Sequence, residues 1–253
     1  MQQGVQTIAR DNLTSRVYNQ LRASLMEGKF WPGHRFKIRE LAAAMGVSET
    51  PVREAVMQLV REKGLEMKAA KSITVAQLSL AQYLELRDIR LHLEGMASEV
   101  ATSKIDNDTI QKLHRFHEEL IKAEDEGRWP DALLANWKFH HTIYRAAEMP
   151  ELLALIEGIW LRNGPLVNFQ YPHARPTYPG KHQHLNVLSA LGRRDPVAVR
   201  QAMQNDLKEG GVGLVRLLEK IESGEIDSED LRREAAGNVK PEPDRAVGSP
   251  ALR

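Results

Sequence analysis

The spacing of apolar residues in the first quarter of the chain predicts three short helices. In the first, over about residues 12–27, an aliphatic residue recurs every four positions, at Leu13, Val17, Leu21 and Leu25. The Gly- and Pro-containing segment "EGKFWPGHRF" interrupts this pattern, and "KIRELAAAMG" resumes it up to Gly46. A third helix is expected at about 50–61, after an N-cap at Ser48 and with Pro51 in its first turn. Two helices joined by a tight turn form a helix-turn-helix motif.

The residues after this motif favour a short β-hairpin. The segment "LEMKAAKSITVAQL" contains a β-branched run, "SITV", at residues 72–75. A hairpin in this place would be the wing of a winged helix. The sequence therefore predicts a winged helix-turn-helix domain over residues 1–76.

From residue 77 onward the pattern changes to long helical periods with few strand signals. Ser79 can cap the first helix, in "SLAQYLELRDIRLHLEGMASEVA". Gly, Pro or Asp signals separate further helices at about 106–126, 130–147, 150–170, 180–193 and 196–222. We therefore predict a mainly α fold, in which an all-α helical bundle over residues 77–235 follows the winged helix. Residues 236–253 lose apolar spacing and gain proline, so this tail is expected to be disordered.

Composition narrows the class of protein. A chain of 253 residues with 42% hydrophobic content can build two modest cores. It has no cysteine, which excludes disulfides and thiolate ligands, so a metal would be held by His, carboxylate or amide groups. No run of about 18 apolar residues occurs, and the first residues lack the apolar core of a signal peptide. We therefore expect a cytoplasmic protein without a membrane partner.

The chain has a net charge of +1, but its charged residues are unevenly distributed along the sequence. Residues 1–76 contain 12 Lys or Arg and 7 Asp or Glu, a net charge of +5. The remaining residues contain 23 and 27, a net charge of −4. The basic amino-terminal part is therefore the candidate for binding a polyanion such as DNA.

Polar residues occur on the apolar faces of the predicted bundle helices. They are Asn136 and His140, four residues apart in "LLANWKFHHTIYRAA", His184 in "HQHLNVLSALG" and Asp206 in "VAVRQAMQNDLKEGG". An unpaired buried carboxylate is unfavourable, so Asp206 is expected to be partnered, protonated or bound to a cation. Two imidazoles and a carboxylate suit divalent Zn, Ni, Mn or Fe, with the Asn136 oxygen as a weaker fourth ligand. The alternative is that these histidines are hydrogen-bonded core residues.

The segment "LMEGKFWPGHRFKIRELAAAMGVSETPVREAVMQLVREKGL", residues 25–65, resembles the winged-helix domain of GntR-type bacterial transcription regulators. The resemblance implies that the helix at 50–61 enters the major groove of DNA. It also implies that Arg39 and Arg53 contact bases or phosphates and that Thr50 bonds to the DNA backbone. Arg can contact guanine through two bonds, and a hydroxyl or main-chain N–H at a helix start, here at Ser48, can meet a phosphate.

The chain departs from this family pattern at two places. The family usually has Arg where this chain has Glu49, and its wing usually contains Gly where this chain reads "KAAKSI". Glu49 can accept a hydrogen bond from the amino group of cytosine, or it can point to solvent or pair with Arg53. Lys68 and Lys71 in the wing are expected to offset the loss of positive charge. We therefore expect DNA binding with a nonstandard operator.

Residues 77 to about 222 resemble the FCD ligand-binding domain of the FadR-like branch of these regulators. The matching pieces are "IRLHLEGMA", "NWKFHHTIY" and "HLNVLSALGRRDPVAVRQAM". Many FCD domains hold a divalent metal through an Asp or Asn, a His four residues later and two further His. The first three of these ligands map onto Asn136, His140 and His184. The fourth falls on Asp206, a departure that favours harder ions such as Mn or Mg more than the family pattern does.

The resemblance also implies a site for a small carboxylate effector beside the metal. Arg90 matches the family's Arg on the first long helix, and its planar fork can hold a carboxylate through two parallel bonds. The alternative is a structural pair between Arg90 and Glu94 on the same helix. Three other polar residues, Arg87, His92 and His182, are expected at the surface.

Together these features predict a ligand-responsive bacterial transcription regulator rather than an enzyme. It would bind operator DNA as a homodimer, and an organic acid would relieve its repression. Two alternatives are a metal-dependent enzyme that carries a DNA-binding head and an interaction module that a metal stabilises.

Overall fold

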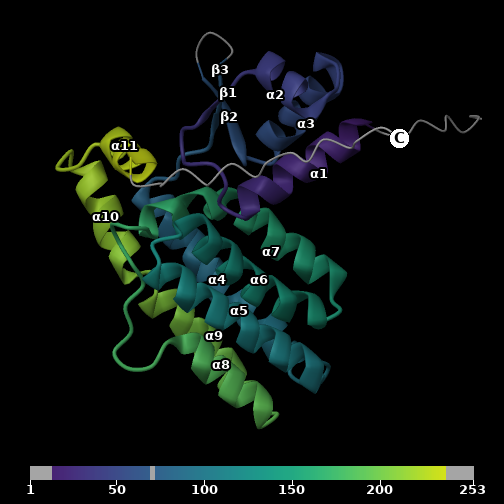
Figure 1. The fold of residues 1–253 in the computed structure, drawn as a ribbon. Coiled ribbons are helices and arrows are strands. Elements are labelled where there is room, and N and C mark those ends of the chain that lie inside the picture. The colour runs from purple at the N-terminus through teal and green to yellow at the C-terminus, as the bar shows by residue number, and fades with distance from the viewer. Residues whose placement is uncertain (1–12, 69–71, 238–253) are drawn as a thin grey trace, which may run out of the picture.

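A computed structural model describes residues 13–68 and 72–237 of the chain (Figure 1). The amino-terminal elements are α1 (Leu13–Met26), β1 (Arg35–Phe36), α2 (Ile38–Met45), α3 (Glu49–Arg61), β2 (Leu65–Lys68) and β3 (Ser72–Val75). The carboxyl-terminal elements are α4 (Leu80–Ala101), α5 (Asn107–Asp125), α6 (Trp129–Ala146), α7 (Pro150–Asn163), the 3-10 helix η2 (Gly164–Gln170), α8 (Gln183–Gly192), α9 (Pro196–Glu209), α10 (Val212–Glu222) and α11 (Ser228–Gly237). Most of the tail expected to be disordered, residues 238–253, lies outside the described residues.

The amino-terminal elements form a winged helix-turn-helix, as predicted. Helix α3 packs on α1 and α2 through its apolar stripe, in which Val52, Ala55 and Leu59 are fully buried. Gly46 ends α2 with a φ of 65°, a left-handed conformation that glycine adopts without steric cost. Ser48 occupies the N-cap position of α3, but its side chain makes no capping hydrogen bond.

The wing is a small antiparallel sheet in the order β1-β3-β2. The predicted hairpin is β2 and β3, in which Met67 pairs with Ile73. Strand β1, which the sequence did not predict, adds Phe36 opposite Ile73 on the other side of β3. Both Phe36 and Ile73 are buried, so the wing joins the apolar core of the head.

The carboxyl-terminal elements form the predicted all-α bundle. Helix α4 starts with a capping box between Ser79 and Gln82 and contacts α6, α7 and α9. Helix α5 packs on α6 and α8, and α8 packs on α9. The largest fully buried side chains of the bundle are Trp160, Tyr144 and Phe139. No helix within the described residues combines the length and the apolar character that crossing a membrane requires.

Some helix boundaries differ from the sequence prediction. The helix expected at 150–170 ends at Asn163 and continues as a 3-10 helix from Gly164, and the helix expected at 180–193 begins only at Gln183. The helix expected at 196–222 is divided into α9 and α10, and α11 was not predicted. At the division, Tyr178 Oη lies only 2.9 Å from where a Cβ on Gly210 would sit. The helix boundaries differ because tertiary contacts determine where these helices end, and the spacing of apolar residues along the chain does not reveal such contacts.

The winged helix and the bundle meet along α1 and α7, which lie side by side (Figure 1). Arg22 on α1 forms an ion pair with Glu157 on α7 at 2.8 Å. Beside it, Leu161 packs so closely on Gly64 that a Cβ there would lie 2.7 Å from Leu161 Cγ. Helix α7 therefore forms the main contact between the bundle and the head.

Candidate functional site

Three of the four residues predicted as metal ligands form a buried cluster. His140 on α6, His184 on α8 and Asp206 on α9 have exposed fractions of 2%, 0% and 7%. His140 Nε2 lies 3.2 Å from His184 Nε2 and 3.2 Å from Asp206 Oδ2, and His184 Nε2 lies 3.9 Å from the same carboxylate oxygen. Ligand atoms around a tetrahedral Zn²⁺ are separated by roughly 3.4 Å. The cluster therefore has the chemistry and the dimensions of a divalent metal site.

Tyr144 determines the orientation of His140. The Tyr144 hydroxyl donates a hydrogen bond to Glu94 Oε2 at 2.5 Å and lies 3.2 Å from His140 Nδ1. Burial, followed by the charge of Glu94, raises the pKa of Tyr144 well above its usual value, so the hydroxyl keeps its proton. Because that proton points to Glu94, the hydroxyl oxygen accepts from His140 Nδ1–H. The lone pair of His140 is then on Nε2 and faces the cluster.

The other two residues of the cluster are also held in metal-binding forms. The Tyr178 hydroxyl donates to Asp206 Oδ1 at 2.9 Å, which leaves Oδ2 toward the histidines. Burial alone would raise the pKa of Asp206, but the neighbouring imidazoles of His184 and His140 lower it below the usual value. Burial holds the pKa of His184 well below its usual value, although Asp206 opposes this effect. An ionised carboxylate and a neutral imidazole are the forms that bind metals.

The cluster lies beside a cavity of about 50 Å³. Its walls include Asn136, His140 and Asp206, together with Arg90 from α4. A water molecule needs about 10–15 Å³ of such space, so the cavity has room for roughly three or four waters or a small organic molecule. The structure thus places Asn136 and Arg90 at the same cavity as the predicted metal ligands.

Arg90 forms the structural pair that was the alternative reading of the sequence. Its Nε lies 2.6 Å from Glu94 Oε1 and its guanidinium lies 4.7 Å from the centre of the Trp160 ring. Glu94 is fully buried and also accepts hydrogen bonds from Tyr144 Oη and, at 2.9 Å, from Trp160 Nε1. Arg90 therefore both lines the cavity and belongs to a buried network that joins α4, α6 and α7.

Two of the three residues expected at the surface are only partly exposed. His92 is exposed, but Arg87 is partly buried and His182 lies at the start of α8 with its ring centre 4.4 Å from that of His184. The sequence interpretation also missed His117 on α5, which is 7% exposed and lies 5.6 Å from the His184 ring. Its spacing from the buried Leu113 and Leu120 was a signal that could have placed it on the inner face.

The predicted DNA-binding residues lie at the surface of the winged helix. Arg39 on α2 is exposed, as are Ser48, Glu49, Thr50 and Arg53 at the start of α3. Arg53 and Glu49 form an ion pair at 3.0 Å, so Glu49 adopts one of the alternatives considered above. Lys68 at the end of β2 is exposed and pairs with Glu66 at 3.1 Å, whereas Lys71 lies outside the described residues.

Comparison with protein families accounts for both halves of the chain. Residues 13–75 match the bacterial regulatory proteins of the gntR family, and residues 85–209 match the FCD domain. The HTH-type transcriptional regulator McbR of Escherichia coli K12 is 32% identical over 195 residues, which cover 76% of this chain and 88% of that protein. The HTH-type transcriptional repressor RspR of the same strain is 25% identical, over 78% of this chain and 86% of RspR.

Solved structures agree with this assignment. The structure of Escherichia coli McbR matches with a TM-score of 0.74 and 30% identity, over 81% of this chain and 98% of that one. A GntR regulator from Rhodococcus sp. RHA1 shares the fold, with a TM-score of 0.62 at 18% identity, over 90% of this chain and 99% of that one.

A winged helix-turn-helix joined to a helical FCD domain defines a class of bacterial transcription regulators. The chain belongs to the GntR family within that class. Because its relatives are regulators, the metal-dependent enzyme considered from the sequence is rejected.

Proposed function

We propose that this protein is a repressor that binds operator DNA as a homodimer and releases it when a small organic acid enters the cavity beside a divalent metal. The observation that carries the proposal is the shared position of His140, Asp206 and Arg90 around one cavity. This arrangement offers both a metal site and a cationic side chain to an anionic ligand. The domain limits at residues 76 and 235 and the cytoplasmic location remain predictions.

His140, His184 and Asp206 would hold the metal, and Asn136, which lines the same cavity, would offer its side-chain oxygen as a further ligand. A bound divalent ion, Zn, Ni, Mn or Fe, would supply positive charge to a carboxylate in the cavity. The protein's own part is to orient His140 through Tyr144 and Asp206 through Tyr178.

Arg90 would contact the effector through the nitrogen that Glu94 does not use. The Nε and Nη2 atoms of Arg90 face Glu94, at 2.6 and 3.4 Å. This leaves the Nη1 atom to donate to a carboxylate in the cavity. The contact expected for Arg90 is therefore a single terminal nitrogen rather than the two parallel bonds that the sequence suggested.

Helix α7 supplies a route from the cavity to the head. Trp160 and Asn163 line the cavity, while Glu157 pairs with Arg22 and Leu161 packs on Gly64. A ligand that shifts α7 would therefore shift α1 and the position of the head in each protomer. In the dimer, this movement would change the separation of the two heads and hence their fit to a two-fold operator. Exposed apolar side chains on α4, such as Ile89 and Met96, offer surface for pairing of protomers.

The first test combines ligand binding with DNA binding. Purified protein of measured metal content is screened by thermal shift against small mono-, di- and hydroxycarboxylic acids. An effector at 100 times its Kd is expected to stabilise the fold by about 2.7 kcal/mol. The same acid should lower the affinity for an operator selected from genomic fragments, measured by fluorescence anisotropy. Chelation of the metal should weaken the thermal shift, and unchanged operator affinity at saturating acid would refute the switch.

A second prediction concerns the contact between α7 and the head. A hydrogen bond with His141, followed by the contacts of Arg22, lowers the pKa of Glu157 to about 2, so Glu157 is charged at neutral pH. Glu157→Gln is expected to leave the thermal shift by the acid unchanged but to reduce the effect of the acid on operator affinity by about 2- to 30-fold, a coupling change of about 0.5–2 kcal/mol. Glu151→Gln, at an exposed position on the same helix, is the matched control. A full response in Glu157→Gln would exclude this route.

A further inference from the structure

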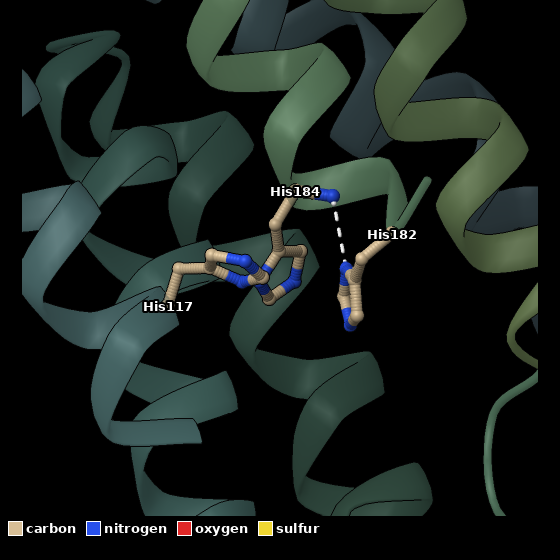
Figure 2. A group of neighbouring side chains, drawn as sticks. All are labelled: His117, His182 and His184. Atoms are coloured by element: carbon tan, nitrogen blue, oxygen red, sulfur yellow. Dashed lines mark hydrogen bonds between the residues drawn. The ribbon is translucent and has the colours of Figure 1, made fainter. Parts of the chain in front are cut away.

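A second group of histidines lies next to the predicted metal ligands. His117 projects from α5 toward His182 and His184 at the start of α8 (Figure 2). One ring nitrogen of each residue lies within 4.8 Å of the others. The ring centres are separated by 5.6 Å (His117 and His184), 5.0 Å (His117 and His182) and 4.4 Å (His182 and His184). Three imidazoles on one tetrahedral ion have their ring centres about 5 Å apart, so small side-chain movements would bring these rings to a common ion.

Two nitrogens of this group have no partner. Within the described part of the chain, the Nδ1 atoms of His117 and His184 are buried and make no hydrogen bond. His117 is 7% exposed and His184 is fully buried, so bulk water does not compensate either atom. Buried polar atoms are nearly always paired, and two unpaired nitrogens in one cluster indicate that a further group binds there.

The two nitrogens of His184 point to different neighbours. Its Nε2 lies 3.2 Å from His140 Nε2, in the cluster with Asp206, whereas its Nδ1 remains without a partner. His182 Nδ1 accepts a hydrogen bond of 3.1 Å from the main-chain N–H of His184. Losing this one capping bond costs far less than a metal–nitrogen bond provides, so it does not prevent His182 from rotating into a metal site.

The surroundings favour entry of a cation. His117 borders a surface groove in which the three carboxylates of Glu118, Asp125 and Glu126 outnumber the single cation of Lys122. These carboxylates attract cations to the side of α5 where His117 lies.

We propose that His117, His182 and His184 form a second metal site, separate from the cluster of His140 and Asp206, with which it shares only His184. Three nitrogen ligands without a carboxylate select Zn²⁺ or Ni²⁺ over Mn²⁺ or Mg²⁺. A fourth coordination position remains for water. The site does not depend on the regulatory function, because metal binding can be measured without DNA or effector.

The test separates the two sites by disabling each in turn. His140→Gln removes a ligand of the first cluster only, and the double variant His140→Gln with His117→Gln disables both. Zn²⁺ affinity is measured by competition with a chelator, and bound metal is counted by mass spectrometry after dialysis. The His140→Gln protein is expected to bind one Zn²⁺ per chain, and adding His117→Gln should weaken this binding at least tenfold. Adding His92→Gln, at an exposed position on α4, should not weaken it.

Two outcomes would overturn the proposal. One is that the folded His140→Gln protein binds no Zn²⁺, and the other is that the double variant binds as tightly as His140→Gln alone. Circular dichroism establishes whether each variant is folded. If His140→Gln does not fold, Asp206→Asn removes the carboxylate of the first cluster with little change of shape, and the same comparison with His117→Gln is made in that background.

Discussion

Glu94→Ala is expected to lower the free energy of unfolding by about 3–5 kcal/mol. Glu94 is fully buried and is the carboxylate that pairs with Arg90, which is itself 6% exposed. Its removal leaves a guanidinium in the protein interior without a counter-charge. It also removes the acceptor for the Tyr144 hydroxyl and the Trp160 indole N–H, so two further buried donors become unpaired. Urea unfolding followed by circular dichroism measures the loss.

A neighbouring ion pair provides the control for this prediction. Glu99, also on α4, pairs with Arg200 at 2.8 Å, but their side chains are 34% and 42% exposed. Glu99→Ala should therefore cost less than about 1 kcal/mol. Replacing Arg90 and Glu94 together by Met and Leu should recover only the part of the loss that comes from the unpaired guanidinium, because Tyr144 and Trp160 still lack their acceptor. A Glu94→Ala protein as stable as Glu99→Ala would show that the buried network does not hold α4, α6 and α7 together.

The helical architecture could be predicted because each helix buries one continuous stripe. On α3 the expected stripe residues Val52, Val56 and Leu59 are at most 1% exposed, and the same rule placed His140, His184 and Asp206 on inner faces. A period of 3.6 residues indicates which side chains point inward. It does not indicate which of them meet across helices, so the cluster and its distances required the structure.

The sequence predictions were wrong where the structure depends on contacts from distant parts of the chain. Gly210 and Gly211 fall inside a regular helical pattern, yet the helix breaks there, beside the hydroxyls of Tyr178 and Tyr83. Tyr178 belongs to the irregular segment after η2, which has no periodicity from which its bond to Asp206 could be predicted. His182 was misplaced for the same reason, since it precedes α8 and its position depends on how that segment folds back.

The pair Arg90 and Glu94 shows a different limit of prediction from sequence. Their separation of four residues on one helix predicts an ion pair, and also permits Arg90 to face a ligand. Which of these two roles Arg90 takes depends on Tyr144 and Trp160, which reach Glu94 from α6 and α7. Because both residues come from other helices, the sequence of α4 alone left the two roles open.

Arg53→Ala is expected to weaken operator binding by about 5- to 150-fold, or about 1–3 kcal/mol, without a change in thermal stability. Arg53 is exposed on the first part of α3, where it makes an ion pair with Glu49, so its removal leaves the core intact. Fluorescence anisotropy at fixed salt, with an operator fragment and a random duplex, measures the change. Arg61→Ala, at the exposed carboxyl-terminal end of α3, removes the same charge and should have a smaller effect.

Glu49→Gln distinguishes the two roles of the acidic side chain in the same assay. If Glu49 only neutralises Arg53 and repels phosphate, the variant should bind both operator and random duplex several-fold more tightly. If Glu49 accepts a hydrogen bond from cytosine, the variant should instead lose its preference for the operator at one base pair. An Arg53→Ala protein that binds the operator as tightly as the unchanged protein would contradict the placement of α3 in the major groove, whichever result Glu49→Gln gives.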